Sequence, residues 1–130
     1  MTSQLKHIGL QVSESDLTNF YEALLGCSIS KIMNLPADDA AAIFKIDSPV
    51  KMIQACFRGL ELELFVHPQE KQVSFNHLCL NLTDAAEIAH KAEKMGFRVH
   101  VRKKPNKPAT YFISDSMNNV FELKNMDTAN

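Results

Sequence analysis

Two histidines and two glutamates occupy matching places in the sequence, and together they could bind a metal ion. The segment KHIGLQV places His7 before an alternating apolar run, and NHLCLNL does the same with His77. Glu63 and Glu122 lie in two further alternating runs, LELELFV and NVFELKN, on the face opposite the apolar side chains. Two neutral imidazoles and two carboxylates suit a divalent ion of borderline hardness. The pattern predicts a metal site if the four side chains converge, and an ordinary solvated sheet face if they do not.

The elements that would position these residues repeat along the chain. A shift of 70 residues superposes His7 on His77, Leu10 on Leu80, Val12 on Leu82, Ser13 on Thr83, and Gly26 on Gly96. In each half the alternating run predicts a strand, and the Ser or Thr is expected to cap the helix that follows. Apolar residues at helical spacing predict that helix, and the Gly is expected at its left-handed C-terminal end.

Three further strands are predicted after each helix. They span residues 28–35, 51–57 and 60–66 in the first half, and 97–103, 110–115 and 119–125 in the second. The first half is longer, and its insertion, PADDAAAIFKI at 36–46, is expected to form a short extra helix. We therefore predict a single α+β domain over 1–130, made of two βαβββ modules with mainly antiparallel sheets. Module 1 is expected at about 4–67 and module 2 at about 73–127.

The composition is that of a compact domain without an obvious polymeric partner. Apolar residues make up 45% of the chain, and the formal charge of −1 favours neither nucleic acid nor an anionic membrane. No apolar run approaches the ~18 residues of a membrane span, and the N-terminus lacks the apolar core of a signal peptide. Cys27, Cys56 and Cys79 are widely spaced and are expected to be reduced thiols. We expect a cytoplasmic protein whose partner is a small molecule.

The ordered set of motifs resembles the vicinal oxygen chelate superfamily. KHIGLQV and NHLCLNL, each followed by a helix and a Gly, combine with LELELF and D-x-x-x-N-x-FEL, and the resemblance covers residues 5–126. Its members include glyoxalase I, methylmalonyl-CoA epimerase, extradiol dioxygenases, and the fosfomycin and bleomycin resistance proteins. The resemblance implies two βαβββ modules whose sheets curl into a cup around one metal. It also implies a homodimer, with each cup closed within one chain or across two.

The resemblance implies a ligand set and two catalytic roles. His7, Glu63, His77 and Glu122 match the family's metal ligands, and the ion is expected to be nickel, cobalt, zinc or manganese. This set is similar to that of glyoxalase I, whereas the epimerase usually has Gln at the place of Glu63, and fosfomycin enzymes use two His and one Glu. Glu122 is the first candidate for the general base. Glu63 could deliver a proton to the other carbon, with Glu61 as its rival.

The resemblance also suggests a reaction class and three substrate contacts. A glyoxalase-like lyase or isomerase would act on a small alpha-hydroxycarbonyl or hemithioacetal through an enediolate. Gln11 stands where bacterial glyoxalase I often has an Arg that holds glutathione, so glutathione is in question. The basic segment at 102–107, with Lys104 and Lys107, lies where the family grips substrate, and it could hold a carboxylate or phosphate or be a solvated loop. The alternatives are an acyl-CoA epimerase of methylmalonyl-CoA type, and a metal-free resistance protein that sequesters a small molecule.

Overall fold

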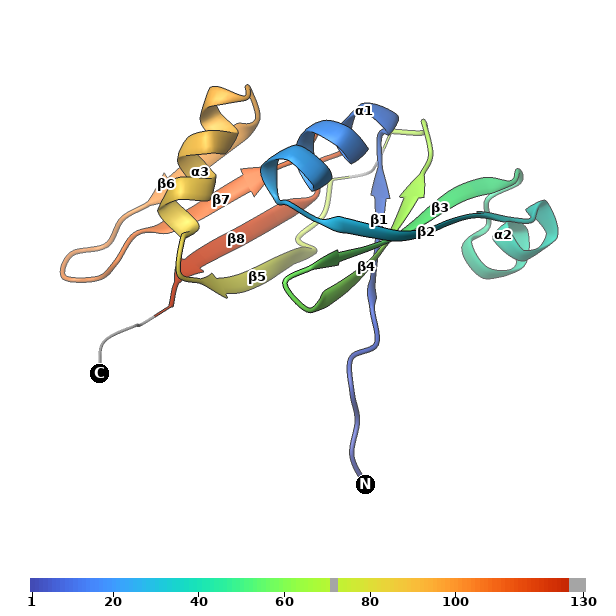
Figure 1. The fold of residues 1–130 in the computed structure, drawn as a ribbon, viewed down its shortest axis with the longest axis horizontal. Helices are drawn as coiled ribbons and strands as arrows, with labels where there is room; N and C mark the ends of the chain where they lie inside the picture. The colour runs from blue at the N-terminus through green and yellow to red at the C-terminus, as the bar shows by residue number, and fades with distance from the viewer. Residues whose placement is uncertain (71–72, 127–130) are drawn as a thin grey trace. The chain divides into compact units, whose positions relative to one another are not determined.

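The computed structural model describes residues 1–70 and 73–126 of the chain. The chain divides into two compact units, Met1–Gln69 and Glu70–Asn130. Each unit holds one four-stranded sheet with its helices, so each half of the sequence repeat forms a βαβββ module (Figure 1). The predicted α+β class is confirmed.

The first unit contains the sheet β1-β4-β3-β2, in that spatial order. Its strands are β1 (Ile8–Val12), β2 (Ser28–Leu35), β3 (Val50–Phe57) and β4 (Leu60–Val66), and its helices are α1 (Glu14–Asp16), η1 (Leu17–Leu24) and α2 (Ala37–Phe44). The first and fourth strands are parallel neighbours, while the remaining pairs are antiparallel. Helix α2 lies between β2 and β3 in the chain and is the insertion helix that the sequence predicted.

The second unit repeats this topology in the sheet β5-β8-β7-β6. Its elements are β5 (His77–Leu82), α3 (Ala85–Lys94), β6 (Arg98–Arg102), β7 (Thr110–Ser114) and β8 (Val120–Asn125). Again the first and last strands of the unit, β5 and β8, are parallel neighbours. This shared pairing places the equivalent residues of the two halves at equivalent positions in their sheets.

The helix after β1 differs from the predicted α-helix. Ser13 caps it as expected, because its hydroxyl accepts a hydrogen bond from the backbone N–H of Asp16 at 3.3 Å. From Leu17 onwards the helix widens into a π-helix, and the N–H of Leu25 donates to the carbonyl oxygen of Phe20 at 2.9 Å. The predicted apolar stripe is still buried, so the helix keeps its amphipathic role with a wider turn.

The predicted capping role of Thr83 is wrong. Helix α3 begins at Ala85, and the N-cap position belongs to Asp84, whose side chain makes no capping hydrogen bond. Strand β5 continues to Leu82, so Thr83 and Asp84 form the turn that leads into the helix. The N-cap is therefore one residue later than the sequence predicted.

Left-handed backbone ends both long helices and closes one hairpin. Gly26 and Gly96 have φ angles of 73° and 90°, as expected at helix C-termini. Arg58 and Gly59, with φ angles of 48° and 88°, form the two-residue turn between β3 and β4. Two successive positive φ angles match the twist of an antiparallel hairpin, so this turn fixes the register of the strand that carries Glu63.

The two faces of each sheet have different burial. Leu62 and Leu64 of β4 and Leu123 of β8 are at most 1% exposed, and the helix side chains Phe20 and Tyr21 are fully buried. The alternate residues of the same strands, which include both glutamates, are partly exposed. Apolar burial therefore accounts for the fold, and the polar face is available for chemistry. Within residues 1–70 and 73–126, no helix has the length and apolar character needed to span a membrane.

Candidate functional site

In the first unit, His7 and Glu63 lie in contact. His7 directly precedes β1, and Glu63 lies in the middle of β4. The parallel pairing of these strands places Gly9 opposite Glu63, so His7 and Glu63 are close on the same sheet face. Nε2 of His7 is 3.1 Å from Oε1 of Glu63, and the side chains are 43% and 19% exposed. Two of the four predicted ligands are thus brought together by the pairing of the first and fourth strands.

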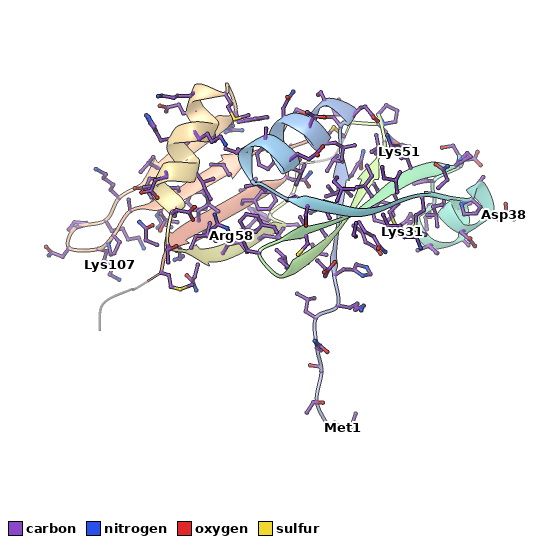
Figure 2. All side chains as sticks on the ribbon, viewed as in Figure 1. Met1, Lys31, Asp38, Lys51, Arg58 and Lys107 are labelled. Carbon is purple, nitrogen blue, oxygen red and sulfur yellow. The ribbon has the colours of Figure 1, made fainter. Side chains whose placement is uncertain are left out.

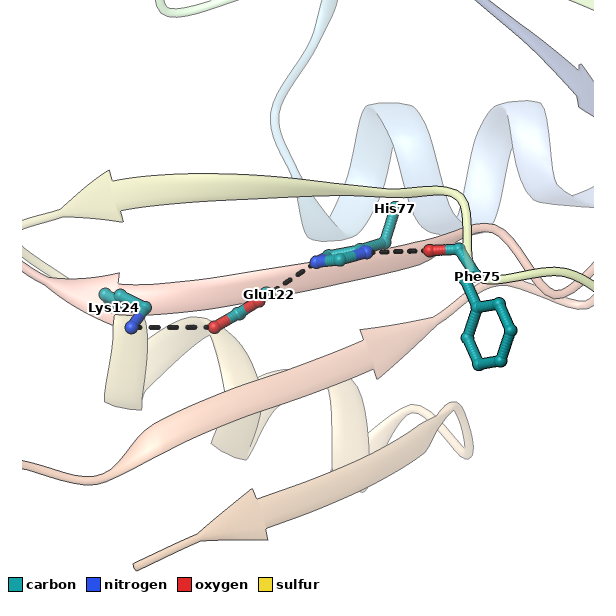
Figure 3. A network of polar contacts seen from close by, with 4 residues as sticks. All are labelled: Phe75, His77, Glu122 and Lys124. Carbon is teal, nitrogen blue, oxygen red and sulfur yellow. Dashed lines mark hydrogen bonds and ion pairs between the residues drawn. The ribbon is translucent and has the colours of Figure 1, made fainter.

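The second unit contains an equivalent pair, His77 and Glu122. Nε2 of His77 is 3.0 Å from Oε1 of Glu122 (Figure 3). The other imidazole nitrogen, Nδ1, is 2.9 Å from the carbonyl oxygen of Phe75. The second carboxylate oxygen of Glu122, Oε2, is 3.6 Å from Nζ of Lys124. His77 is therefore held at both ring nitrogens, and Glu122 is engaged at both oxygens.

The contacts of His77 favour a positive charge between its ring and Glu122. A carbonyl oxygen only accepts, so Nδ1 of His77 carries a hydrogen and donates it to Phe75. A neutral ring would then present the lone pair of Nε2 to a carboxylate oxygen, which is unfavourable unless a cation lies between them. That cation is a proton or a metal ion. The hydrogen bond to the Phe75 carbonyl, and secondly the one to Glu122, raise the pKa of His77. Both contacts therefore favour the protonated, positively charged ring when no metal is bound.

The arrangement fits a protein-bound metal. A histidine that donates one ring N–H to a backbone carbonyl presents its other nitrogen as a ligand of fixed tautomer. Each unit adds a carboxylate oxygen beside that nitrogen. Among the residues that the structure describes, no three His, Cys, Asp or Glu side chains are grouped closely enough to hold a metal ion. Each unit by itself therefore offers half of the predicted four-ligand set.

The turn before β8 supports the position of Glu122. Asp115 and Asn119 are buried, at 5% and 2% exposure. Oδ1 of Asp115 accepts hydrogen bonds from the backbone N–H groups of Asn119 at 2.8 Å and Met117 at 3.0 Å. The side-chain amide of Asn119 donates to Oδ2 of Asp115 at 2.8 Å. Because Asn119 directly precedes β8, this network fixes the start of the strand that carries Glu122.

A cationic cavity of about 290 Å³ lies beside Glu122. Its lining includes Arg102, Lys104, Lys107, Thr110, Glu122 and Lys124. Lys104 and Lys107, the predicted substrate contacts, belong to the loop between β6 and β7, where Figure 2 labels Lys107. Strand pairing sets Thr110 between Arg102 and Lys124 across the sheet. Four cationic side chains around one carboxylate make this cavity suitable for an anionic group.

Gln11 and Glu61 lie outside the two His–Glu pairs, and their predicted roles remain predictions. Gln11 belongs to the first unit, and its amide donates to the carbonyl oxygens of Gln69 at 2.6 Å and His67 at 3.4 Å. It thereby holds the segment after β4, although it also borders a cavity in that unit. Glu61 lies on the same face of β4 as Glu63 but is exposed. Neither residue belongs to a His–Glu pair.

Two contributors to the site were missed from the sequence. Lys124 follows Glu122 by two positions in β8, so strand alternation could have indicated that the two side chains share a face. The carbonyl of Phe75 is a backbone group, and no residue type signals its role. Both contact the His77–Glu122 pair, whose two residues the sequence had predicted as metal ligands.

Solved structures with similar folds include fosfomycin resistance proteins and a glyoxalase family protein. FosX, a fosfomycin resistance protein of Listeria monocytogenes, has a TM-score of 0.74 at 16% identity over 98% of this chain and 97% of that chain. FosX from Mesorhizobium loti has a TM-score of 0.68 at 15% identity, covering 98% of this chain and 95% of that chain. A glyoxalase family protein from Enterococcus faecalis has a TM-score of 0.68 at 17% identity, covering 92% and 95%. No family model and no curated protein matches the sequence.

These likenesses establish the fold of the chain. Two βαβββ modules in one chain, each with its first and last strands as parallel neighbours, define a duplicated α+β architecture. The match to FosX and to a glyoxalase family protein extends over nearly the whole of each chain. The chain has the fold of the vicinal oxygen chelate superfamily, as the motifs predicted.

Proposed function

We propose that this protein is a metal-dependent, glyoxalase-like lyase or isomerase that acts on a small anionic substrate. The observation that carries the proposal is the matched pair of contacts, His7 with Glu63 and His77 with Glu122. Together they would supply two imidazole nitrogens and two carboxylate oxygens to one divalent ion, within one chain or between two. Nickel, cobalt, zinc and manganese all accept such ligands. A FosX structure from Listeria monocytogenes contains Mn(II), which supports a divalent ion in this fold.

Glu122 is the proposed general base. When bound, a divalent ion would act as a Lewis acid and stabilise the negative charge that develops on a substrate oxygen. Glu122 directs Oε1 towards His77 and Oε2 towards Lys124 at the cationic cavity. It can therefore keep one oxygen on the His77 side and accept a substrate proton at the other. Glu63, also partly exposed and paired with a histidine, is proposed to take the proton of the substrate hydroxyl and deliver it to the adjacent carbon, while Glu122 gives the proton that it removed to the neighbouring oxygen.

The cationic cavity is the proposed binding place for the anionic group of the substrate. Lys104 and Lys107 line it together with Arg102 and Lys124. Its volume of about 290 Å³ is suited to a small molecule. A carboxylate, phosphate or phosphonate held there would lie next to Glu122. The group that binds the substrate and the group that transfers its proton would then be neighbours.

A second candidate function is the modification of a phosphonate, as in fosfomycin resistance. Two observations favour it: the similarity to FosX, and the cationic cavity beside Glu122. One FosX structure is a complex with Mn(II) and a dihydroxypropylphosphonic acid. Against it stands the pairing of Glu63 with His7, which supplies a fourth ligand where the fosfomycin enzymes of the family use two His and one Glu.

Activity assays with defined metals separate the candidates. Protein loaded with nickel, cobalt, zinc or manganese would be supplied with hemithioacetals of methylglyoxal made from glutathione and from simpler thiols. Product formation that depends on added metal supports the glyoxalase-like reaction. Consumption of fosfomycin in the presence of Mn(II), without conversion of any hemithioacetal, would transfer the assignment to the second candidate. Absence of turnover with every metal and both substrate classes would contradict the proposed chemistry.

We also propose a cytoplasmic homodimer. Each unit offers only two ligands, so a four-ligand site between chains would require dimerisation. The three cysteines are free thiols, which fits a reducing compartment. Light scattering at micromolar concentrations should give about twice the chain mass of 14.6 kDa. A particle with the mass of one chain over that range would rule out the dimer, and cell fractionation would test the compartment.

A further inference from the structure

The first unit contains an apolar cavity that the proposed metal chemistry does not use. Its volume is about 320 Å³. Its lining includes Gly9, Phe44, Ile46, Val50, Phe65 and His67. No carboxylate, ammonium or guanidinium group belongs to its described lining. The cavity is thus chemically unlike the cationic cavity of the second unit.

Two aromatic rings and a glycine form the wall of this cavity. The ring of Phe65 lies over Gly9, since a Cβ on Gly9 would be 3.2 Å from Cε2 of Phe65. Gly9 therefore permits the ring to lie close to β1. Phe44 packs edge-on against Phe65, with ring centroids 5.2 Å apart and an interplanar angle of 60°. Phe44 is nevertheless 50% exposed, so the ring pair is incompletely covered.

The insertion helix is what creates the cavity. Phe44 is the last residue of α2, which the first unit has and the second unit lacks. In the second unit the residue two positions after the acid is Lys124, whereas in the first unit it is Phe65. The same place in the repeated fold has therefore become cationic in one unit and aromatic in the other. The cavity therefore depends on two features that only the first unit has, the helix α2 and a Phe at position 65.

We propose that this cavity is a binding site for an uncharged aromatic group. Aromatic rings prefer edge-to-face or offset contacts, and Phe44 and Phe65 both line the cavity without being buried. An apolar cavity of about 150 Å³ holds benzene, so this larger one has room for a substituted or fused ring. A charged group would lose its hydration there without a partner among the lining side chains. Glu63 and Phe65 share one face of β4, so Phe65, which lines the cavity, lies about 7 Å along the strand from Glu63.

Titration with indole, an uncharged fused aromatic, tests this site in the full chain. Backbone amide shifts would be followed by 1H–15N NMR in metal-free protein. The expected shifts centre on Gly9, Phe44, Ile46 and Phe65. The Phe44→Ala variant should bind indole about tenfold more weakly, and Phe44→Leu about threefold more weakly, because Leu restores apolar area without the ring. Ile43→Ala is the matched control, since Ile43 is on the same helix, is 63% exposed and lies outside the cavity lining, and it should bind as wild type.

Three results would overturn the proposal. They are shifts centred away from the cavity, unchanged indole affinity in Phe44→Ala, and affinity for cyclohexanol equal to that for indole. Metal content should be the same in Phe44→Ala and wild type. Because the titration uses metal-free protein, failure of the proposed metal centre would leave indole binding intact. Failure of this aromatic site would likewise leave the metal content unchanged, so the two proposals can be judged separately.

Discussion

Replacing Glu122 by Gln should nearly abolish turnover while the protein remains folded. Gln preserves the shape of the side chain but removes its charge and its capacity to accept a proton. General-base catalysis contributes about 10²- to 10⁴-fold, which corresponds to about 3–5 kcal/mol in the barrier. Loss of a carboxylate ligand should also weaken metal binding, and the remaining three predicted ligands should still hold the ion at high concentration.

The same substitution should lower the free energy of unfolding much less than it raises the barrier to reaction. Glu122 contacts His77 at 3.0 Å and Lys124 at 3.6 Å, and these partners are 42% and 49% exposed. Exposed ion pairs contribute up to about 1 kcal/mol each, so the free energy of unfolding should fall by about 2 kcal/mol at most. Domains of this size have about 5–15 kcal/mol of stability. The two effects therefore differ enough in size to be separated.

The assay compares kcat, metal content and melting temperature for wild type, Glu122→Gln and the control Glu93→Gln. Glu93 is an exposed residue of α3, outside both cavities, and its variant should match wild type in all three measurements. Metal would be supplied in excess so that reduced affinity does not appear as reduced chemistry. A Glu122→Gln protein that is metal-loaded and turns over at a near-normal rate would refute the assignment, and proton transfer would then have to pass through another group, with Glu63 the next to test.

Three further predictions follow from the site and the core. Glu63→Gln should lower kcat less than Glu122→Gln does, because in the superfamily that the motifs resemble the epimerase usually has Gln at this place; equal losses would contradict the division of roles. The double change Lys104→Ala and Lys107→Ala should raise KM for an anionic substrate about tenfold or more and weaken its salt dependence, with little effect on kcat, whereas an unchanged KM would exclude the cationic cavity. Burial raises the pKa of Cys27 to about 11, so iodoacetamide at pH 7.5 should label exposed Cys79 and spare Cys27 until the protein is unfolded, as mass spectrometry would detect; equal labelling in the native state would contradict this.

The strands were predictable because their two faces meet different surroundings. The run LELELFV predicted a strand at 60–66, and β4 is Leu60–Val66. The prediction for 119–125 differs from β8, Val120–Asn125, by one residue. Alternating burial imposes a period of two on the sequence, and the turn residues Arg58 and Gly59 mark where one strand ends. Such signals are local, so the strands can be predicted without knowledge of the tertiary fold.

The pairing inside the site was only partly predictable. The sequence indicated that four side chains of the right type share the polar faces, but alternation does not specify which strands are neighbours. The structure adds that β1 lies beside β4, and β5 beside β8, which is why each histidine contacts the glutamate of its own half. The order of strands in a sheet depends on contacts between residues far apart in the chain. A repeat in the sequence indicates only that the two halves share one strand order, and it does not indicate which order that is.

Other features left no clear trace in the sequence. The apolar stripe from Leu17 to Leu25 fits both an α-helix and the wider π-helix, since either winding buries the same side chains. The carbonyl of Phe75 acts through the backbone, where residue type carries no information. The aromatic cavity requires Phe44 and Phe65, which are distant in the chain, to meet above Gly9. In each case the decisive contact depends on backbone geometry.

Metal stoichiometry in the two histidine variants is the most direct test of the central claim. Wild-type protein purified without chelator, together with His7→Ala and His77→Ala, would be analysed for all four candidate metals by mass spectrometry. Because each unit supplies only half of the ligand set, we predict about one divalent ion per chain in wild type and loss of stoichiometric metal in either variant alone. Full metal content in both variants would contradict a shared site built from the two His–Glu pairs.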